Sequence, residues 1–169
     1  MGVTVHFEGQ LLNQENYGML ITVVRDFAKK NRWLTEPIKA ENVILKRVQN
    51  EKDSNYEGPV KGIVIYPHED CDPLRFEFDR DLYVQEYVKT QFAGTAIHEA
   101  VIRLLQLVRQ YFKSLEVFDE GEFWETQDHK ILEKNFQSFY HALDDELKKY
   151  PKAKVKVKLP SGRIVDLMT

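Results

Sequence analysis

The chain contains a single cysteine, Cys71, so it cannot form an internal disulfide, and nothing in it requires an oxidising compartment. No apolar run approaches the length of a membrane span. The first residues lack the basic start and apolar run of a secretory signal, and His6 stands where a myristoylation signal needs Ser or Thr. These features predict a cytoplasmic protein without a membrane segment.

Motifs for several chemistries are also missing. The sequence has no phosphate-binding glycine loop, no nucleophile elbow and no dinucleotide fingerprint. Residues 98–102, "HEAVI", begin like the zinc-protease pattern HExxH but place Ile102 where the second histidine should stand. His98 lies beside the apolar stripe of a predicted helix, which indicates a partly buried structural histidine. We predict no cofactor and no metal.

The composition is that of a folded protein. The 169 residues are 43% hydrophobic and 30% charged, with ten Phe and eight Tyr, which predicts a single domain over residues 1–169. The net charge of −3 is unevenly distributed, because residues 148–169 carry seven Lys and Arg against one Asp. That segment has a charge of +6, which leaves −9 for residues 1–147. An acidic body with a basic C-terminal segment favours a basic binding partner.

The apolar spacing predicts the secondary structure. Helical spacing predicts helices at 13–31, from Thr95 onward and at 128–149, with Asn13, Thr95 and Asp128 as N-caps. Alternating or continuous apolar runs predict strands at 3–8, 42–48, 60–66, 73–79, 82–89 and briefly within 115–124.

Turn residues complete this prediction. We expect a loop at Pro37 and a C-terminal hairpin that turns at Pro160 and Ser161, with Gly162 in the left-handed conformation. The sequence therefore predicts the α+β class. We expect an antiparallel sheet, a meander plus the C-terminal hairpin, with about three helices packed mainly on one face.

Polar residues gather in the segment that contains the cysteine. This cluster comprises His68, Glu69, Asp70, Cys71 and Asp72. A zinc site would need a second ligand pair, which the spacing does not supply. A catalytic thiolate is disfavoured because the neighbouring carboxylates raise the thiol pKa. Pro67 and Pro73 bracket the cluster, and a polar turn between two strands is the favoured interpretation.

Acidic and aromatic residues alternate further along the chain. The members of this run that could meet a partner are Asp119, Glu120, Glu122, Phe123, Trp124 and Glu125. The favoured interpretation is structural, with the rings in the core and the acids in solvent. Recognition of a basic protein ranks second, because charges steer and rings anchor. Acid–base catalysis ranks third.

Lysines alternate with apolar residues in the C-terminal segment, at Lys152, Lys154, Lys156 and Lys158. Such a row could bind a phosphate backbone, but it has neither the arginines nor the stacking aromatics of most nucleic-acid sites. Lysine on an exposed edge strand also prevents edge-to-edge aggregation, and that interpretation is favoured. We do not expect nucleic-acid binding.

Two functional hypotheses follow. The first is a non-enzymatic protein-binding module, of an immunity, antitoxin or adaptor kind, whose acidic surface binds a basic protein. The alternative is a small hydrolase that uses carboxylates and histidines of the 68–72 and 118–125 loops together with His98. Neither the partner nor the oligomeric state can be derived from the sequence.

Overall fold

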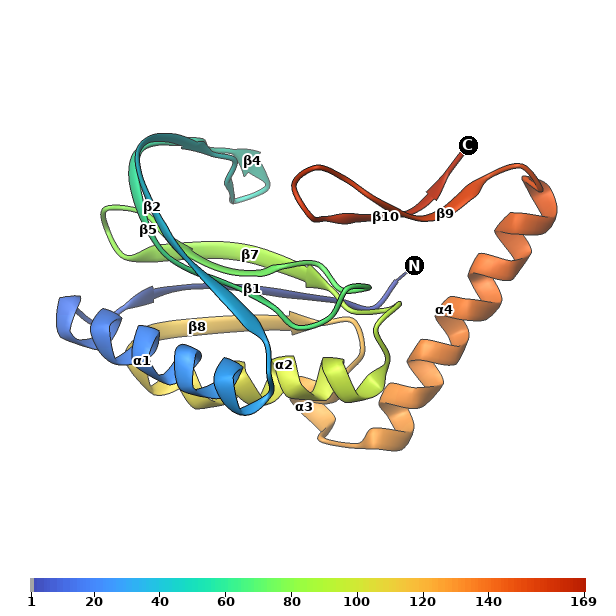
Figure 1. Ribbon diagram of the computed structural model, residues 1–169, viewed down its shortest axis with the longest axis horizontal. Helices are drawn as coiled ribbons and strands as arrows, with labels where there is room; N and C mark the ends of the chain where they lie inside the picture. The colour runs from blue at the N-terminus through green and yellow to red at the C-terminus, as the bar shows by residue number, and fades with distance from the viewer. Residues whose placement is uncertain (1) are drawn as a thin grey trace.

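The computed structural model describes residues 2–169. Two three-stranded antiparallel groups form its main layer (Figure 1). The first has the order β7-β1-β8, with β7 at Tyr83–Lys89, β1 at Thr4–Leu11 and β8 at Phe112–Asp119. The second has the order β2-β5-β6, with β2 at Leu34–Leu45, β5 at Tyr56–Tyr66 and β6 at Leu74–Phe78.

Hydrogen bonds from the residues that flank β6 to the two ends of β7 join the two groups. Near one end the Asp79 N–H donates to the Tyr83 carbonyl at 3.1 Å. Near the other end the Asp72 N–H donates to the Lys89 carbonyl at 3.1 Å, and the Asp72 carboxylate accepts from the Lys89 N–H at 3.0 Å. The strands β2, β5, β6 and β7 therefore form a meander, which β1 and β8 extend. The predicted α+β class with an antiparallel sheet is confirmed.

The helices and the C-terminal hairpin lie on opposite sides of β7-β1-β8 (Figure 1). Helices α1 (Gln14–Lys30) and α2 (Thr95–Val108) cover one face. The 3-10 turn η1 (Arg109–Tyr111) leads into β8, and α3 (Phe123–Thr126) follows it. Helix α4 (His129–Lys149) then runs past the end of the sheet, from the side of the helices to the side of the hairpin. The hairpin pairs β9 (Lys154–Lys158) with β10 (Ile164–Met168). None of the helices within residues 2–169 has the length and apolar character needed to cross a membrane.

The core lies between the sheet and the helices. Strand alternation turns Val5 and Phe7 of β1 inward, where they join Leu20 and Val24 of α1 in one buried cluster. Further members come from the other helices and strands: Phe76, Phe78, Val84, Val88, Leu104, Leu105, Leu132, Phe136 and Phe139. Each large side chain buried here contributes about 1.5–3 kcal/mol. The polar residues between them on β1 face the other way.

The predicted helix ends are mostly confirmed. Asn13 caps α1 by accepting from the Asn16 N–H at 2.9 Å, and Asp128 caps α4 by accepting from the Lys130 N–H at 2.9 Å. The cap predicted at Thr95 is wrong. Gly94, with φ of 97°, is the N-cap of α2, because its positive φ reverses the chain and moves Thr95 into the first helical position.

The strand bounds differ from the prediction in three places. Pro37 lies within β2, because β2 is an edge strand and a proline there removes no ladder hydrogen bond. Between the predicted strands at 42–48 and 60–66, the structure has a small two-stranded ladder, β3 (Val48–Gln49) with β4 (Lys52–Asp53), and the start of β5. The strand sought within 115–124 is β8, which begins earlier and ends before α3.

The predicted turn of the C-terminal hairpin is confirmed. Gly162 has φ of 88°, and its N–H donates to the Leu159 carbonyl at 2.9 Å.

Two glycines should respond to alanine in opposite directions. Gly62 of β5 has φ of 154°, and a Cβ there would meet the Phe76 carbonyl oxygen of β6 at 1.7 Å. Gly62→Ala should therefore lower the free energy of unfolding by about 3 kcal/mol. Gly18 is exposed within α1 with nothing near a Cβ, so Gly18→Ala should raise the free energy by about 0.8 kcal/mol. Urea titrations of both variants test this pair, and equal effects would contradict it.

Candidate functional site

A groove of about 790 Å³ opens on the face of β7-β1-β8 that the helices leave uncovered. One wall is the arm, which we define as residues 44–56, where β2 and β5 reach over the sheet with β3 and β4 at the tip (Figure 1). The other wall is formed by Arg163, in the turn of the C-terminal hairpin. Side chains on the floor and walls include His6, Glu8, Ile44, Lys46, Arg47, Val48, Gln85, Glu86, Tyr87, Glu116, Phe118 and Arg163.

Strand register arranges the floor in two rows. His6 of β1 lies opposite Tyr87 of β7 and Phe118 of β8, and we call these three residues the aromatic row. Two residues along, Glu8 lies opposite Gln85 and Glu116, and we call these three the carboxylate row. Alternation along each strand turns both rows away from the core.

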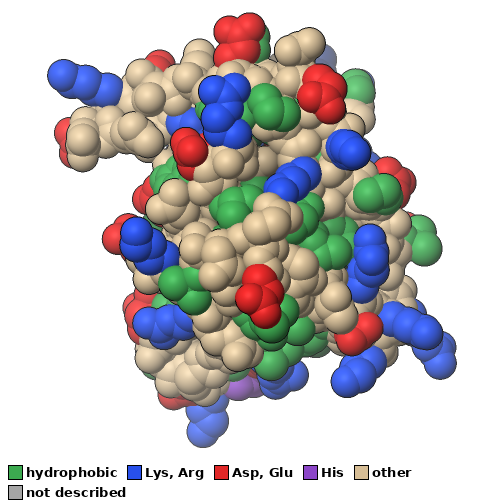
Figure 2. Space-filling view, turned by 90° about the vertical axis from the view of Figure 1, so that its left-hand side faces the viewer, with side chains coloured by type: hydrophobic (Ala, Val, Ile, Leu, Met, Phe, Trp, Pro, Cys, Tyr) green, Lys and Arg blue, Asp and Glu red, His purple; other side chains and the backbone are tan. Residues whose placement is uncertain are grey.

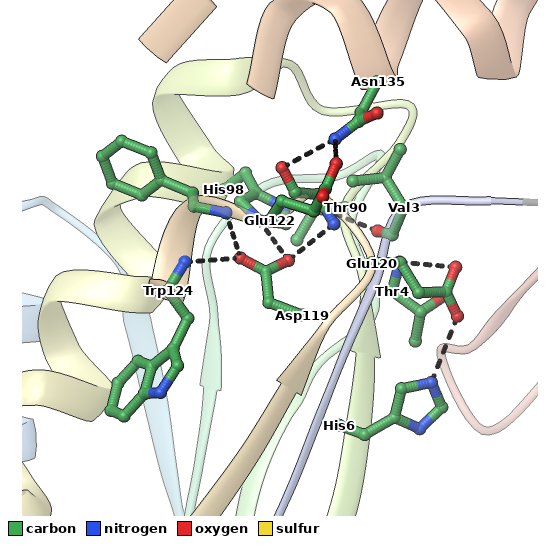
Figure 3. Close-up of polar contacts among 12 residues, drawn as sticks. Val3, Thr4, His6, Thr90, His98, Asp119, Glu120, Glu122, Trp124 and Asn135 are labelled. Carbon is green, nitrogen blue, oxygen red and sulfur yellow. Dashed lines mark hydrogen bonds and ion pairs between the residues drawn. The ribbon is translucent and has the colours of Figure 1, made fainter. Parts of the chain in front are cut away.

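The aromatic row is a half-open platform. The His6 ring centroid lies 6.0 Å from that of Tyr87 and 5.8 Å from that of Phe118, with tilted planes. His6 Nε2 also lies 3.2 Å from the Glu120 carboxylate, which fixes the imidazole between the rings (Figure 3). Phe118 is 65% exposed, so a large apolar surface at one end of the row has no cover in the chain itself.

The carboxylate row places two acids side by side. Glu8 accepts a hydrogen bond from the Tyr83 hydroxyl and another from Gln85 Nε2 at 2.9 Å. Burial, together with the hydrogen bond and charge of Glu8, raises the pKa of Tyr83 to about 12. Neither Glu8 nor Glu116 forms an ion pair within residues 2–169. Like charges opposite each other on adjacent strands repel, so this row costs stability.

A buried arginine holds the arm over the sheet. Arg47 is 4% exposed, stacks 5.1 Å from the Tyr83 ring centroid, and lies 3.7 Å from the Asp79 carboxylate. The Val48 N–H donates to Gln85 Oε1 at 2.9 Å, and Gln85 Nε2 donates to the Val48 carbonyl at 2.9 Å. Arg47 Nε is the one buried side-chain nitrogen or oxygen of residues 2–169 without a hydrogen-bond partner.

A second arginine holds the hairpin at the opposite wall. Arg163 lies 2.8 Å from the Glu86 carboxylate, 3.5 Å from that of Asp72, and 4.0 Å above the Tyr87 ring. Asp72 also accepts from the Ile164 N–H at 2.8 Å. Burial raises the pKa of Asp72 and of Glu86, although Arg163 opposes the shift in both. The guanidinium therefore compensates for two desolvated acids while it fastens β10 to β7.

The cluster at 68–72 forms the turn between β5 and β6. The Cys71 N–H donates to the His68 carbonyl at 3.2 Å, and the cysteine side chain is buried. Burial raises the Cys71 pKa most, and Asp72 adds to it, so desolvation is a larger cause than the acidic neighbours that the sequence emphasised. Within residues 2–169, no group of three or more His, Cys, Asp or Glu residues is placed to hold a metal ion.

Lysines of the hairpin face this turn. Lys156 lies 2.9 Å from the Asp70 carboxylate, and Lys158 Nζ donates to the Glu69 carbonyl at 3.0 Å. Part of the basic segment is thus neutralised by the acidic body of the same chain. Positive and negative side chains are also interspersed at the end of the molecule seen in Figure 2, where they surround hydrophobic patches.

The acidic and aromatic run at 119–125 does not form one surface. Asp119 and Phe123 are buried, whereas Glu122 and Glu125 are exposed. Trp124 is half-buried, and the Arg109 guanidinium lies over it, 5.8 Å from the centroid of the Trp124 ring. Glu120 points toward His6 beside the groove. A partner could meet the exposed acids but not the two buried residues.

Asp119 instead organises the end of β8 from within (Figure 3). Its carboxylate accepts backbone N–H bonds from Gly121 at 2.8 Å and from Phe123 and Trp124 at 2.9 Å each, and it lies 2.9 Å from His98 Nε2. Burial alone would raise the Asp119 pKa. The hydrogen bond and charge of His98, with the backbone donors, outweigh burial and hold the pKa below its ordinary value.

His98 links this carboxylate to Thr90. Thr90 Oγ1 lies 2.6 Å from His98 Nδ1 and donates to the Val3 carbonyl at 3.0 Å. A hydroxyl, an imidazole and a carboxylate in series resemble the arrangement of a hydrolytic triad. Thr90 and His98 are fully buried and Asp119 is 3% exposed, so no substrate reaches them. The series is a structural connection between β7, α2 and β8.

The hydrolase hypothesis also requires His68, Glu69, His98 and Glu120 in one pocket. His68 and Glu69 lie in the β5–β6 turn, His98 lies in the core, and Glu120 pairs with His6. No hydrogen bond or ion pair within residues 2–169 joins any two of the four.

Comparison with known proteins identifies no relative. No protein-family model matches the chain, and neither curated proteins nor solved structures give a significant match. Any functional argument therefore rests on the chain's own geometry.

Replacing the buried carboxylate should destabilise the fold. Each oxygen of Asp119 faces two of the four donors, so Asp119→Asn leaves two of them facing an amide N–H₂ group, and the free energy of unfolding should fall by about 3 kcal/mol at neutral pH. Because the folded pKa is lowered, the stabilising contribution is present above the unfolded value of 3.8 and is lost as pH falls through the folded value.

Urea titrations from neutral to acid pH measure this. The difference between wild type and Asp119→Asn should shrink below about pH 4. Glu122→Gln, an exposed carboxylate nearby, is the matched control and should show no such difference. A gap between wild type and Asp119→Asn that stays constant with pH would refute the role assigned to the ionised carboxylate.

Proposed function

We propose that this protein is a binding module without enzymatic activity and that it takes a segment of another protein into the groove between the arm and the hairpin. The observation that carries the proposal is the exposure of large apolar side chains around one opening. Ile44 is 63% exposed, Val48 is 54%, Tyr87 is 39% and Phe118 is 65%. Exposed apolar groups gathered within a polar rim are typical of interaction sites.

The construction of the groove supports a protein segment as its occupant. The floor is a rigid antiparallel sheet, while both walls are fastened by buried or half-buried arginines. Apolar side chains at the walls and floor offer anchors, and the carboxylates between them offer polar contacts. An immunity protein, an antitoxin or an adaptor working in the cytoplasm would bind in this way.

The groove is a different site from the acidic run that the sequence indicated. No residue of that run lines the groove. Glu120 acts on the groove only through its contact with His6, and Phe118, the residue before the run, is part of the floor. The buried members of the run serve the end of β8, so the binding residues are drawn instead from β1, β7, β8 and the arm. The hydrolase alternative receives no support from the placement of its four residues.

A variant of the groove should lose its partner. Phe118→Ser removes the most exposed aromatic surface of the floor and leaves the core untouched. We expect cross-linking in extracts of the native source to capture a protein with wild type and to capture at least about fivefold less of it with Phe118→Ser, since one anchor contributes 1 kcal/mol or more.

The control is Leu107→Ser on α2. Leu107 is 46% exposed but lies on the helical side of the sheet, so this variant should capture as much partner as wild type. Equal capture by wild type, Phe118→Ser and Leu107→Ser would contradict the proposed site. Circular dichroism and thermal unfolding of both variants would test whether they remain folded.

A further inference from the structure

We infer that the segment bound in the groove presents a lysine or arginine side chain, whose positive charge lies between Glu8 and Glu116 next to the aromatic row. This inference rests on the proposed function and specifies the chemistry of the partner. Its motivation is a pair of neighbouring carboxylates in the groove, Glu8 and Glu116, with which no cation of residues 2–169 forms an ion pair.

The carboxylate row carries the first argument. Glu8 and Glu116 are direct cross-strand neighbours, and their side chains share the groove side of the sheet. Gln85 and Tyr83 donate to Glu8 but bring no charge, and Glu116 accepts no side-chain hydrogen bond within residues 2–169. A cation placed between the two carboxylates would replace this repulsion with two attractions.

The cations of the groove carry the second argument. Arg47 is directed at Asp79, and Arg163 is held by Glu86 and Asp72. Both guanidinium groups are therefore committed to acids of the same chain. Lys46 remains, but it is exposed on the arm and forms no ion pair with either acid of the row. The floor consequently offers negative charge to an incoming ligand.

Two further features point to a peptide rather than an isolated cation. Ile44 and Val48 of the arm line the same groove and are 63% and 54% exposed, so residues on either side of the cation would find apolar surface to contact. The aromatic row lies two residues along the strands from Glu8 and Glu116, and its rings can cover the aliphatic stem of a lysine or stack with a guanidinium. Together these features match a basic residue within an extended chain.

Selection from a display library of random peptides on the immobilised full-length protein tests the inference. We expect the recovered peptides to be enriched in Lys or Arg beside apolar residues. A recovered peptide, made synthetically, should bind Glu116→Gln at least about fivefold more weakly than wild type by calorimetry. Its affinity for wild type should also fall as salt is raised.

Glu133→Gln is the matched control, because Glu133 is an exposed acid of α4 outside the groove, and it should bind like wild type. If the recovered peptides are not enriched in basic residues but still need Phe118 for binding, the inference of a bound lysine or arginine is refuted and the groove is retained as the binding site. A selection that yields no peptides, or peptides equally bound by Phe118→Ser, would count against both.

A stability measurement separates a binding role from a structural one. If Glu116 served the fold, Glu116→Gln would lower the melting temperature. Because its charge opposes that of Glu8, we expect the melting temperature instead to rise by about 1–2 °C while peptide binding weakens. A lowered melting temperature would overturn the assignment of the row to a ligand.

Discussion

The carboxylate of Asp119 fixes the geometry on which the rest of the site depends. It receives three backbone N–H groups from the turn after β8 and the imidazole of His98 from α2, all without access to water. Because neighbouring strand residues face opposite sides, an inward Asp119 requires Phe118 and Glu120 to face outward. The contact that ties two helices to the sheet therefore also orients one end of the groove floor, and Glu120 in turn positions His6.

The walls of the groove depend on charge pairs between distant parts of the chain. Arg47 ties the arm to the β6–β7 turn, and Arg163 ties the hairpin to β7. Lys156 and Asp70 add a further link between the hairpin and the β5–β6 turn. Part of the positive charge of the C-terminal segment is therefore neutralised by acids of the same chain. The negative charge left for a partner of the groove is that of the carboxylates with which these cations form no ion pair.

Local patterns in the sequence were sufficient for most of the fold but not for the site. The apolar stripes predicted α1, α2 and α4, and the turn residues Pro160 to Gly162 predicted the hairpin, because each depends on neighbours in the chain. The groove depends on register between β1, β7 and β8, which lie far apart in sequence, so no local pattern places Glu8 opposite Glu116. Asp119 did carry a usable signal: an aspartate that ends a strand two residues before Gly121 and four before a helical turn suits a carboxylate that accepts several backbone N–H groups.

The carboxylate row differs from the buried acids elsewhere in the molecule, because those acids have cationic partners or several backbone donors and the row does not. Asp72 and Glu86 are desolvated and share Arg163, and Asp119 has His98 and three backbone donors. Glu8 has neutral donors alone, and Glu116 has none within residues 2–169. The repulsion between them costs roughly 0.2–1 kcal/mol, which is small against the 5–15 kcal/mol that stabilises a typical domain. A cost of that size leaves the fold intact, and the cation that we propose for the groove would remove it, so the row is compatible with a stable fold and suited to a basic ligand.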